Sequence, residues 1–180
     1  MKITPSARLM YRMITPDDAQ LLFELDQDPS VMQYLNGGVP TSMEDIHNRF
    51  LPRIASFHNE EKGWGLWHVA TKEEHEFIGW ILVRPMFYFT EERDDTDMEL
   101  GWRFKQTTWE QGYATEAALH VATHIEKLNE LKSFSAVAAV DNIGSIAVMK
   151  KLGMHFVKQD IHTDPTWQTE VVYYTKPLID

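Results

Sequence analysis

A short turn in the middle of the chain has the residue types of an anion-binding site. Residues 109–117 read Trp-Glu-Gln-Gly-Tyr-Ala-Thr-Glu-Ala, and they join a predicted strand (97–104) to a predicted helix (114–131). A helix begins with backbone N–H groups that have no partner inside the helix, and its dipole adds roughly half a positive charge there. Gly112 has no Cβ, so a pyrophosphate could approach the backbone closely, and Thr115 adds a hydroxyl donor. The turn therefore predicts a site for a phosphate-bearing ligand.

The turn does not match two common phosphate-binding motifs. It lacks the spaced glycines and the Lys-Ser/Thr pair of a Walker A loop, and it lacks the GxGxxG pattern of dinucleotide-binding domains. A single glycine at the start of a helix is by itself a weak signal. The residues on either side of the turn must therefore identify the ligand.

The strand before the turn carries a carboxylate at its centre. Successive side chains of a strand point to opposite faces. This alternation places one set of residues on one face (Asp97, Glu99, Gly101 and Arg103) and a second set on the other (Met98, Leu100, Trp102 and Phe104). Partial burial would raise the pKa of Glu99 toward a range useful for a general base. The alternative is a solvated strand residue or the partner of an ion pair.

Two histidines in the helix after the turn have the spacing of a metal site. His120 and His124 are four residues apart, but they line up with Glu116 and Lys127 in one polar stripe. The opposite stripe is apolar: Ala117, Val121, Ile125 and Leu128. This pattern is typical of a solvated helix face, so we predict no metal here.

Three helices are predicted in the first third of the chain: one from Thr15, one over residues 28–34, and one from Thr41 or Ser42 to about residue 59. Thr15 is a plausible N-cap, with Pro16 at the first helical position and Asp18 at a capping-box spacing. Pro52 interrupts the third helical pattern and predicts a kink or break there.

The remaining pattern is rich in strands. They are predicted over residues 8–13, 64–70, 76–83, 97–104, 133–140, 154–161 and 167–175. A loop over residues 84–95 contains the aromatic run 87–89, and a further helix over residues 142–152 ends at Gly153. This order indicates an α+β, or mixed α/β, domain. We find no repeat or linker, so a single domain over residues 1–180 is expected.

Composition excludes several functional classes. The chain has 180 residues, a net charge of −10, a pI near 5.2 and no cysteine. Its acidity argues against general nucleic-acid binding and is compatible with a cationic small molecule or a basic peptide. Without cysteine there is no disulfide, zinc ribbon or thiol nucleophile. No apolar run approaches the ~20 residues of a membrane helix, and no signal-peptide core is present, so no membrane association and a cytoplasmic location are expected.

Five motifs in order carry a resemblance to a known family. The first three are Arg8-Leu9-Met10-Tyr11-Arg12, residues 28–35 and residues 77–80 (Phe-Ile-Gly-Trp). They are followed by the turn after the strand of Glu99, and by Asn-Ile-Gly-Ser at 142–145 leading into Lys-Leu-Gly-Met-His-Phe at 151–156. Together they resemble the GNAT superfamily of N-acetyltransferases, in particular the branch of the ribosomal-protein N-terminal acetyltransferases. The resemblance covers nearly the whole chain.

The resemblance implies a mostly antiparallel, twisted sheet of about seven strands, splayed between the fourth and fifth, with acetyl-CoA bound in the V-shaped opening. The pantetheine arm would run beside the fourth strand like an added strand, along Trp102, Arg103 and Phe104. The pyrophosphate would lie on the turn at Gln111, Gly112, Tyr113, Ala114 and Thr115. In the last turn of its helix, Lys151 could meet the nucleotide 3′-phosphate, although a cation there already suits the helix dipole. One departure is Glu110, where the family frequently has glycine.

The resemblance also implies the catalytic residues. An amine nucleophile must lose a proton, because an alkylammonium has a pKa near ~10. The matching glutamate is the proposed base in related enzymes, often through a water, which assigns this role to Glu99. Asn142 would hold the pantetheine amide, and Ser145 would lie near the sulfur as a proposed acid or hydrogen-bond donor. A simple capping role for Asp141 or Asn142 is the alternative.

The sequence therefore predicts an acetyl-CoA-dependent N-acetyltransferase that acts by direct attack in a ternary complex. The acceptor would be a primary amine, either a protein or peptide N-terminus or a small molecule. The helix over residues 41–59 and the loop over residues 84–95 are expected to flank the acceptor. The alternative is a catalytically weak regulatory module that binds acyl-CoA. The chain is expected to be a monomer or a homodimer.

Overall fold

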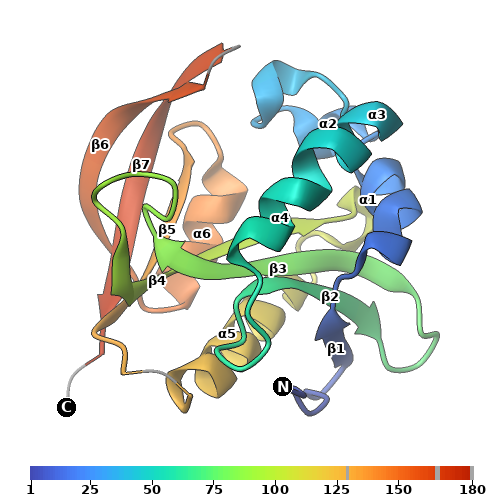
Figure 1. The fold of residues 1–180 in the computed structure, drawn as a ribbon, viewed down its shortest axis with the longest axis horizontal. Helices are drawn as coiled ribbons and strands as arrows, with labels where there is room; N and C mark the ends of the chain where they lie inside the picture. Colours follow the sequence, from blue (N-terminus) through green and yellow to red (C-terminus); the bar gives the residue numbers. More distant parts are fainter. Residues whose placement is uncertain (129, 165–166, 179–180) are drawn as a thin grey trace.

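The computed structural model describes residues 1–128, 130–164 and 167–178, and its centre is one seven-stranded sheet (Figure 1). The spatial order of the strands is β1-β2-β3-β4-β5-β7-β6. Their bounds are β1 (Leu9–Met13), β2 (Gly65–Thr71), β3 (Phe77–Met86), β4 (Asp94–Phe104), β5 (Ser133–Ala139), β6 (His155–Asp164) and β7 (Trp167–Pro177).

The sheet opens between β4 and β5. Every other neighbouring pair is antiparallel, whereas these two strands are parallel and pair only where residues 97–99 meet residues 133–135. Beyond Glu99 the strands separate, so the edge of β4 over residues 100–104 is not paired with β5. The expected fold class, including the splay between the fourth and fifth strands, is confirmed.

Helices cover both faces of the sheet. Their bounds are α1 (Ala19–Leu25), α2 (Pro29–Met32), α3 (Met43–Asp45), α4 (Leu51–Phe57), α5 (Tyr113–Glu126) and α6 (Ile143–Lys151). Figure 1 shows α4 crossing in front of the central strands while α5 lies behind them. Among the described residues, no helix is long and apolar enough to cross a membrane.

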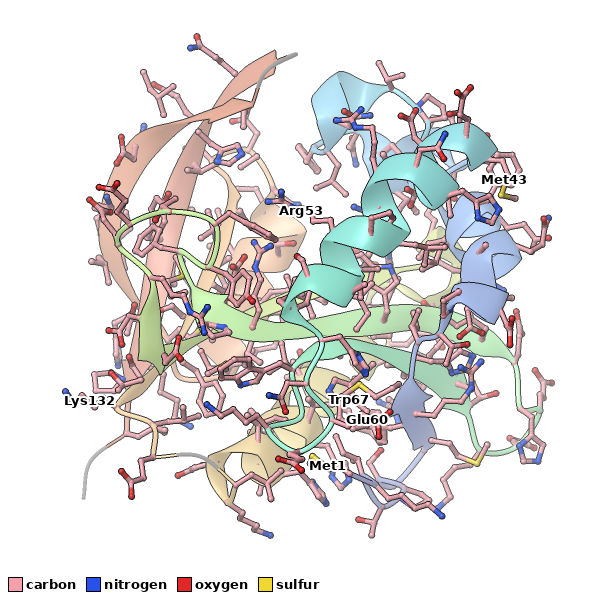
Figure 2. All side chains as sticks on the ribbon, viewed as in Figure 1. Met1, Met43, Arg53, Glu60, Trp67 and Lys132 are labelled. Atoms are coloured by element: carbon pink, nitrogen blue, oxygen red, sulfur yellow. The ribbon has the colours of Figure 1, made fainter. Side chains whose placement is uncertain are left out.

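Each face has its own hydrophobic core. One core joins α5 and α6 to residues such as Trp67, Met98 and Leu100, and the other joins α1 and α4 to residues such as Leu66 and Trp80. Trp67, labelled in Figure 2, is fully buried, and its indole N–H donates to the Gly63 carbonyl at 3.0 Å. Because β4 contributes Met98, Leu100 and Phe104 to the first core, the predicted alternation of its faces is confirmed.

The helix predicted over residues 41–59 runs from Met43 to Phe57, and the irregularity predicted near Pro52 is a π-helical segment rather than a break. Ser42 caps it by accepting from the Asp45 N–H at 3.0 Å. A π-helical segment (Ile46–Phe50) then connects α3 to α4, which has Pro52 near its start. Proline cannot donate to a carbonyl one turn back and would clash with it, and the wider π turn provides room. The first predicted helix begins as expected, since the Asp18 carboxylate accepts from the Thr15 N–H at 2.9 Å.

The predicted loop over residues 84–95 was too long. β3 continues to Met86 and β4 already begins at Asp94, so Arg84 lies within a strand, opposite Glu99. The register shifts between Pro85 and Met86, which is where a proline is tolerated in a strand. The closing hairpin is likewise longer than predicted, because β6 extends through Asp164.

The predicted solvated face of α5 was wrong. The Glu116 carboxylate accepts from the Ser6 hydroxyl at 2.7 Å and from the Arg8 backbone N–H at 2.8 Å. His120 Nε2 lies 2.7 Å from the Thr4 carbonyl oxygen, and His120 stacks on Tyr11 with ring centroids 5.2 Å apart. The polar stripe therefore holds the segment that precedes β1, because its side chains satisfy the polar groups of an extended chain.

We expect acid to destabilise the protein through His68. Burial, reinforced by the positive charge of Arg12, lowers the pKa of His68 to about 4, and Asp18 opposes this shift. Between pH 6.5 and pH 4 the unfolded chain therefore binds a proton that the folded protein does not, so the stability contribution is lost as the pH falls. From pH 7 to pH 5 the loss is about 2 kcal/mol.

The measurement is the free energy of unfolding by urea at both pH values, for the wild type and for His68→Phe, which keeps an aromatic ring against Phe77. The variant should lose less stability on acidification than the wild type, by about 2 kcal/mol. Equal losses would show that His68 is not responsible.

Candidate active site

The turn before α5 presents free backbone donors. Gly112 is the N-cap of α5, with φ 80°, and no side chain caps this helix in the described structure. The Glu116 N–H donates to the Gly112 carbonyl at 3.0 Å and is the first bond inside the helix. The N–H groups of the three residues before it (Tyr113, Ala114 and Thr115) consequently have no intrahelical acceptor. This geometry can accept an anion, and the phosphate contact that the sequence indicates stays a prediction.

Arg8 holds the turn in place from the opposite side. Its guanidinium donates to the Gln111 carbonyl at 2.9 Å, forms an ion pair with Glu116 at 2.7 Å and stacks over the Tyr113 ring at 4.3 Å. The Gln111 side chain donates to the Thr107 carbonyl at 2.9 Å. The Gln111 side chain and the Tyr113 ring therefore contact other protein groups, and the turn also offers a ligand its backbone N–H groups.

Glu110 is held in a left-handed conformation, with φ 60°, and its side chain is exposed. This conformation suits glycine, which is frequent at this position in the family that the sequence resembles. A side chain with a Cβ pays a conformational penalty of about 1 kcal/mol there. Within the described residues, the Glu110 carboxylate has no hydrogen-bond or ion-pair partner that would compensate.

We expect Glu110→Gly to stabilise the protein by about 1 kcal/mol, because it removes this backbone strain. We also expect it to tighten CoA binding several-fold, since it removes a negative charge beside the anion site. Glu110→Gln is the matched control: it should tighten binding similarly without the gain in stability. Urea unfolding and calorimetry with CoA would measure the two effects. Weaker CoA binding by both variants would show that the carboxylate is not repulsive.

At the open edge of β4, the groups available to a ligand are mainly those of the backbone. The Phe104 side chain is buried in the core. The Arg103 side chain forms an ion pair with the buried Asp26 and lies over the Trp80 ring at 5.0 Å. The Trp102 side chain lies on the same face as Phe104 and reaches α6, where its indole nitrogen lies 3.2 Å from the Ser145 hydroxyl. A ligand beside β4 would therefore pair with its unpaired backbone, as an added strand does.

Glu99 is an ion-pair partner. Arg84 on β3 donates two hydrogen bonds to its carboxylate, at 2.7 Å and 3.1 Å, and both side chains are largely buried. On the same face, Asp97 accepts from the Ser135 hydroxyl at 2.7 Å, and burial raises the pKa of Asp97. Bidentate pairing fixes the orientation of the Glu99 carboxylate. Glu99 itself lies at the point where β4 and β5 separate.

Asn142 and Ser145 form a fixed pair at the start of α6. Asn142 is the N-cap, and its Oδ1 accepts from the Ser145 N–H at 3.0 Å. The capping alternative is therefore correct for Asn142. It does not exclude a binding role, because the cap uses the oxygen and leaves the amide NH₂ donors of the side chain. The Ser145 hydroxyl lies 3.2 Å from the Trp102 indole nitrogen.

The two predicted catalytic residues belong to opposite faces of the sheet. Glu99 lies on the face of α1 and α4, where Arg84 pairs with it and lies over Phe57 of α4, whereas Ser145 is on α6, on the other face. Only the separation of β4 from β5 connects these faces. A ligand in this opening would meet the carboxylate from one side and the hydroxyl from the other.

The predicted acceptor segments contact each other. The Tyr88 hydroxyl donates to the Ser56 carbonyl at 2.8 Å, and Arg53 of α4, labelled in Figure 2, stacks over the Phe89 ring at 3.6 Å. Both segments are on the face of Glu99. Lys151, in the last turn of α6, is exposed, and its proposed phosphate contact stays a prediction.

Arg84 is the functional candidate that sequence reasoning missed, because it was assigned to a loop. The available signal was strand length: if β3 and β4 extend symmetrically about their connection, Arg84 and Glu99 become cross-strand neighbours of opposite charge.

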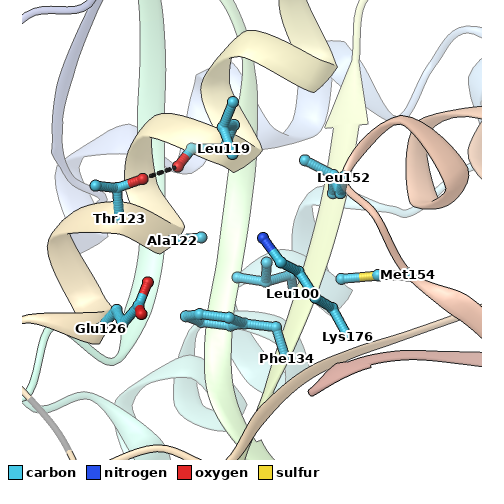
Figure 3. Close-up of a pocket in the computed structure, with 9 residues that line it drawn as sticks. All are labelled: Leu100, Leu119, Ala122, Thr123, Glu126, Phe134, Leu152, Met154 and Lys176. Atoms are coloured by element: carbon cyan, nitrogen blue, oxygen red, sulfur yellow. Dashed lines mark hydrogen bonds between the residues drawn. The ribbon is translucent and has the colours of Figure 1, made fainter. Parts of the chain in front are cut away.

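The hollow shown in Figure 3, between α5 and β7 under the Lys176 side chain, contains none of the predicted site residues. We therefore locate the candidate site at the β4–β5 opening.

Comparisons with known proteins agree with this geometry. The family model described as "Acetyltransferase (GNAT) domain" matches residues 8–155. The chain is 33% identical over 178 residues to the uncharacterized N-acetyltransferase YnaD of Bacillus subtilis, covering 96% of this chain and 95% of that protein.

Solved structures show the same fold. A GNAT-family acetyltransferase from Bacillus anthracis has a TM-score of 0.76 at 26% identity, with 98% of each chain covered. RimL, a ribosomal L7/L12 alpha-N-protein acetyltransferase in complex with coenzyme A, has a TM-score of 0.77 at 16% identity, with 99% of this chain and 98% of that chain covered. The chain therefore belongs to the GNAT acetyltransferase family and is an acetyl-CoA-dependent N-acetyltransferase, as its motifs indicate.

Proposed function

We propose that the protein transfers the acetyl group of acetyl-CoA to a primary amine by direct attack in a ternary complex at the β4–β5 opening. The observation that carries this proposal is the convergence of three features on one gap in the sheet. They are an unpaired strand edge, free N–H groups at the start of α5, and a carboxylate and a hydroxyl on opposite sides. Each feature matches a different part of the reaction.

The residues present fit acetyl-CoA. A Cβ built on Gly112 would meet only the Arg8 guanidinium, at 3.5 Å, so the outer side of the turn is open to a bulky anion. The backbone edge of residues 100–104 can pair with the amides of a pantetheine arm, and the Asn142 amide can donate to one of its carbonyls. When bound, acetyl-CoA supplies a thioester that an amine can attack.

The residues of the chain then divide the proton chemistry between them. The Glu99 carboxylate, oriented by Arg84, takes the proton that the amine must lose, either directly or through a water. The C–N bond forms as the C–S bond breaks, and the sulfur leaves as a thiolate. The Ser145 hydroxyl donates a hydrogen bond to that sulfur, which is easier for a hydroxyl than complete proton transfer. The described chain has no cysteine to carry an acyl group.

The side from which the acceptor enters follows from the face on which Glu99 lies. The amine would enter from the side of α4 and residues 87–89, opposite to the nucleotide. RimL acts on a protein α-amino group, which supports a peptide N-terminus as one acceptor class, and a small amine is the other. The net charge of −10 supports a cationic acceptor through long-range attraction.

The discriminating experiment measures thiol release from acetyl-CoA across a panel of N-terminal peptides, polyamines, amino sugars and amino acids. Turnover of one class with a saturable rate would support the enzyme, and the class would name the acceptor. Tight CoA binding with no acceptor turned over would instead support the alternative, a weakly active acyl-CoA-binding regulatory module. No thermal shift with CoA would contradict both.

A further inference from the structure

A side-chain hydrogen bond joins β4 to α6 in the β4–β5 opening. The Trp102 indole Nε1–H donates to the Ser145 Oγ at 3.2 Å, and both side chains are half-buried. Trp102 lies three residues beyond Glu99, the last residue of β4 that pairs with β5. The bond therefore lies in the part of this opening where β4 and β5 have already separated.

Donor and acceptor roles in this bond are fixed by chemistry. An indole N–H can only donate, so the Ser145 oxygen must accept, and its single hydroxyl hydrogen must point elsewhere. The Ser145 backbone N–H is bound to Asn142 Oδ1, which holds the residue at the start of the helix. Within the described part of the chain, the Ser145 hydroxyl donates to no protein group. Its proton is therefore available for a ligand.

We propose that Trp102 is a positioning residue that keeps the Ser145 hydroxyl turned as a donor toward the sulfur of the thioester. This inference rests on the proposed function, because it names the residue that sets the polarity of the hydroxyl at the same site. Ser145 keeps its proton throughout and gives only a hydrogen bond to the leaving thiolate, while the proton of the amine goes to Glu99. Trp102 acts through Ser145 and is not itself a catalytic residue.

A role in packing alone is the competing explanation. The Trp102 ring packs against the core on the α5–α6 face and could support a pantetheine arm without affecting Ser145. Trp102→Phe keeps an aromatic ring and removes the donor. If Trp102 acts through Ser145, its substitution matters only while the Ser145 hydroxyl is present.

The kinetic test uses the wild type, Trp102→Phe, Ser145→Ala and the double variant with an amine that the wild type acetylates. We expect Trp102→Phe to lower kcat about 3- to 10-fold and Ser145→Ala about 10- to 100-fold, with little change in the KM for acetyl-CoA. In the Ser145→Ala background, Trp102→Phe should have no further effect on kcat. Additive losses, or a loss confined to KM, would overturn the inference.

A second readout does not depend on turnover. The indole ¹⁵N–¹H resonance of Trp102, assigned by its disappearance in Trp102→Phe, should move when Ser145 is replaced by alanine. An unmoved resonance would show that the bond is absent and would overturn the inference even if the enzyme is active. A wild type that turns over no amine would contradict the proposed function instead.

The matched control is Trp64→Phe. This residue is buried in the same core, but its indole nitrogen has no hydrogen-bond partner in the described structure, and it lies outside the site. The substitution removes the same atoms, from a residue that is more deeply buried than Trp102. It should leave kcat within about twofold and the Trp102 resonance unmoved.

Discussion

Replacing Glu99 by glutamine is expected to lower kcat by about 100-fold for an alkylamine acceptor at neutral pH. Glutamine keeps the length of the side chain and an oxygen that can accept from Arg84, but it cannot take a proton from an ammonium. The affinity for CoA should stay within about twofold, because the proposed cofactor contacts are the turn and the strand edge. Steady-state kinetics and calorimetry would measure the two quantities.

Acceptor amines of different pKa distinguish two roles for Glu99: a base that takes the proton of the amine, or a residue that only positions Arg84. An amine whose pKa lies below the assay pH is already neutral, so it needs less help in losing a proton before it attacks. With such an acceptor, the loss in Glu99→Gln should shrink to a few-fold, and raising the pH should partly rescue the alkylamine reaction. Equal losses for both acceptors at every pH would contradict the assignment of Glu99 as base.

Asp97→Asn is the matched control for this experiment. Asp97 lies two residues away on the same face, so its substitution makes the same change from carboxylate to amide in the same strand. The asparagine keeps an oxygen that can accept from the Ser135 hydroxyl, so the substitution should perturb the site little. We expect kcat to stay within about threefold. A loss as large as that of Glu99→Gln would show that the assay reports general damage to β4.

The local parts of the site could be predicted from the sequence because they depend on nearby residues. Alternation assigned Glu99 and Trp102 to opposite faces of β4, and Gly112 marked the start of α5. Capping by Asp141 or Asn142 was the alternative to cofactor binding, and Asn142 is the N-cap. Each of these features is settled within a few residues of chain, which is the distance over which dihedral and capping preferences act.

The partners of the site residues could not be predicted in this way. Arg84 is 15 residues from Glu99, Trp102 is 43 from Ser145, and Arg8 is 108 from Glu116. Which of many charged side chains meet depends on strand register and on the packing of helices against the sheet. The polar stripe of α5 illustrates the same limit. Its spacing is compatible with exposure to solvent and equally with binding of the segment that precedes β1.

The buried ion pair between Asp26 and Arg103 should dominate the stability of the site region. Asp26 follows α1, its side chain is only 3% exposed, and it also accepts from the Thr41 hydroxyl at 2.6 Å. Removing one partner of a buried pair leaves an uncompensated charge. We therefore expect Asp26→Ala to lower the free energy of unfolding by about 3–5 kcal/mol, measured by urea denaturation.

Asp95→Ala is the control for this prediction. Asp95 also receives two hydrogen bonds from an arginine, Arg93, at 2.6 Å and 3.0 Å, but their side chains are 44% and 38% exposed. Water screens such a pair and solvates the arginine that remains, so the loss should be below about 1 kcal/mol. Similar losses for Asp26→Ala and Asp95→Ala would show that burial of the Asp26 pair is not decisive.

Replacing both partners tests what Arg103 contributes to the cofactor site. The double variant Asp26→Leu, Arg103→Met removes both charges and fills the space with apolar groups, so it should recover most of the stability lost in Asp26→Ala. Because the Arg103 side chain points to Asp26 and only its backbone lies on the open edge of β4, the Kd for CoA should change less than about twofold in this variant. A tenfold weaker Kd in a folded double variant would mean that the Arg103 side chain itself leaves Asp26 to bind the cofactor.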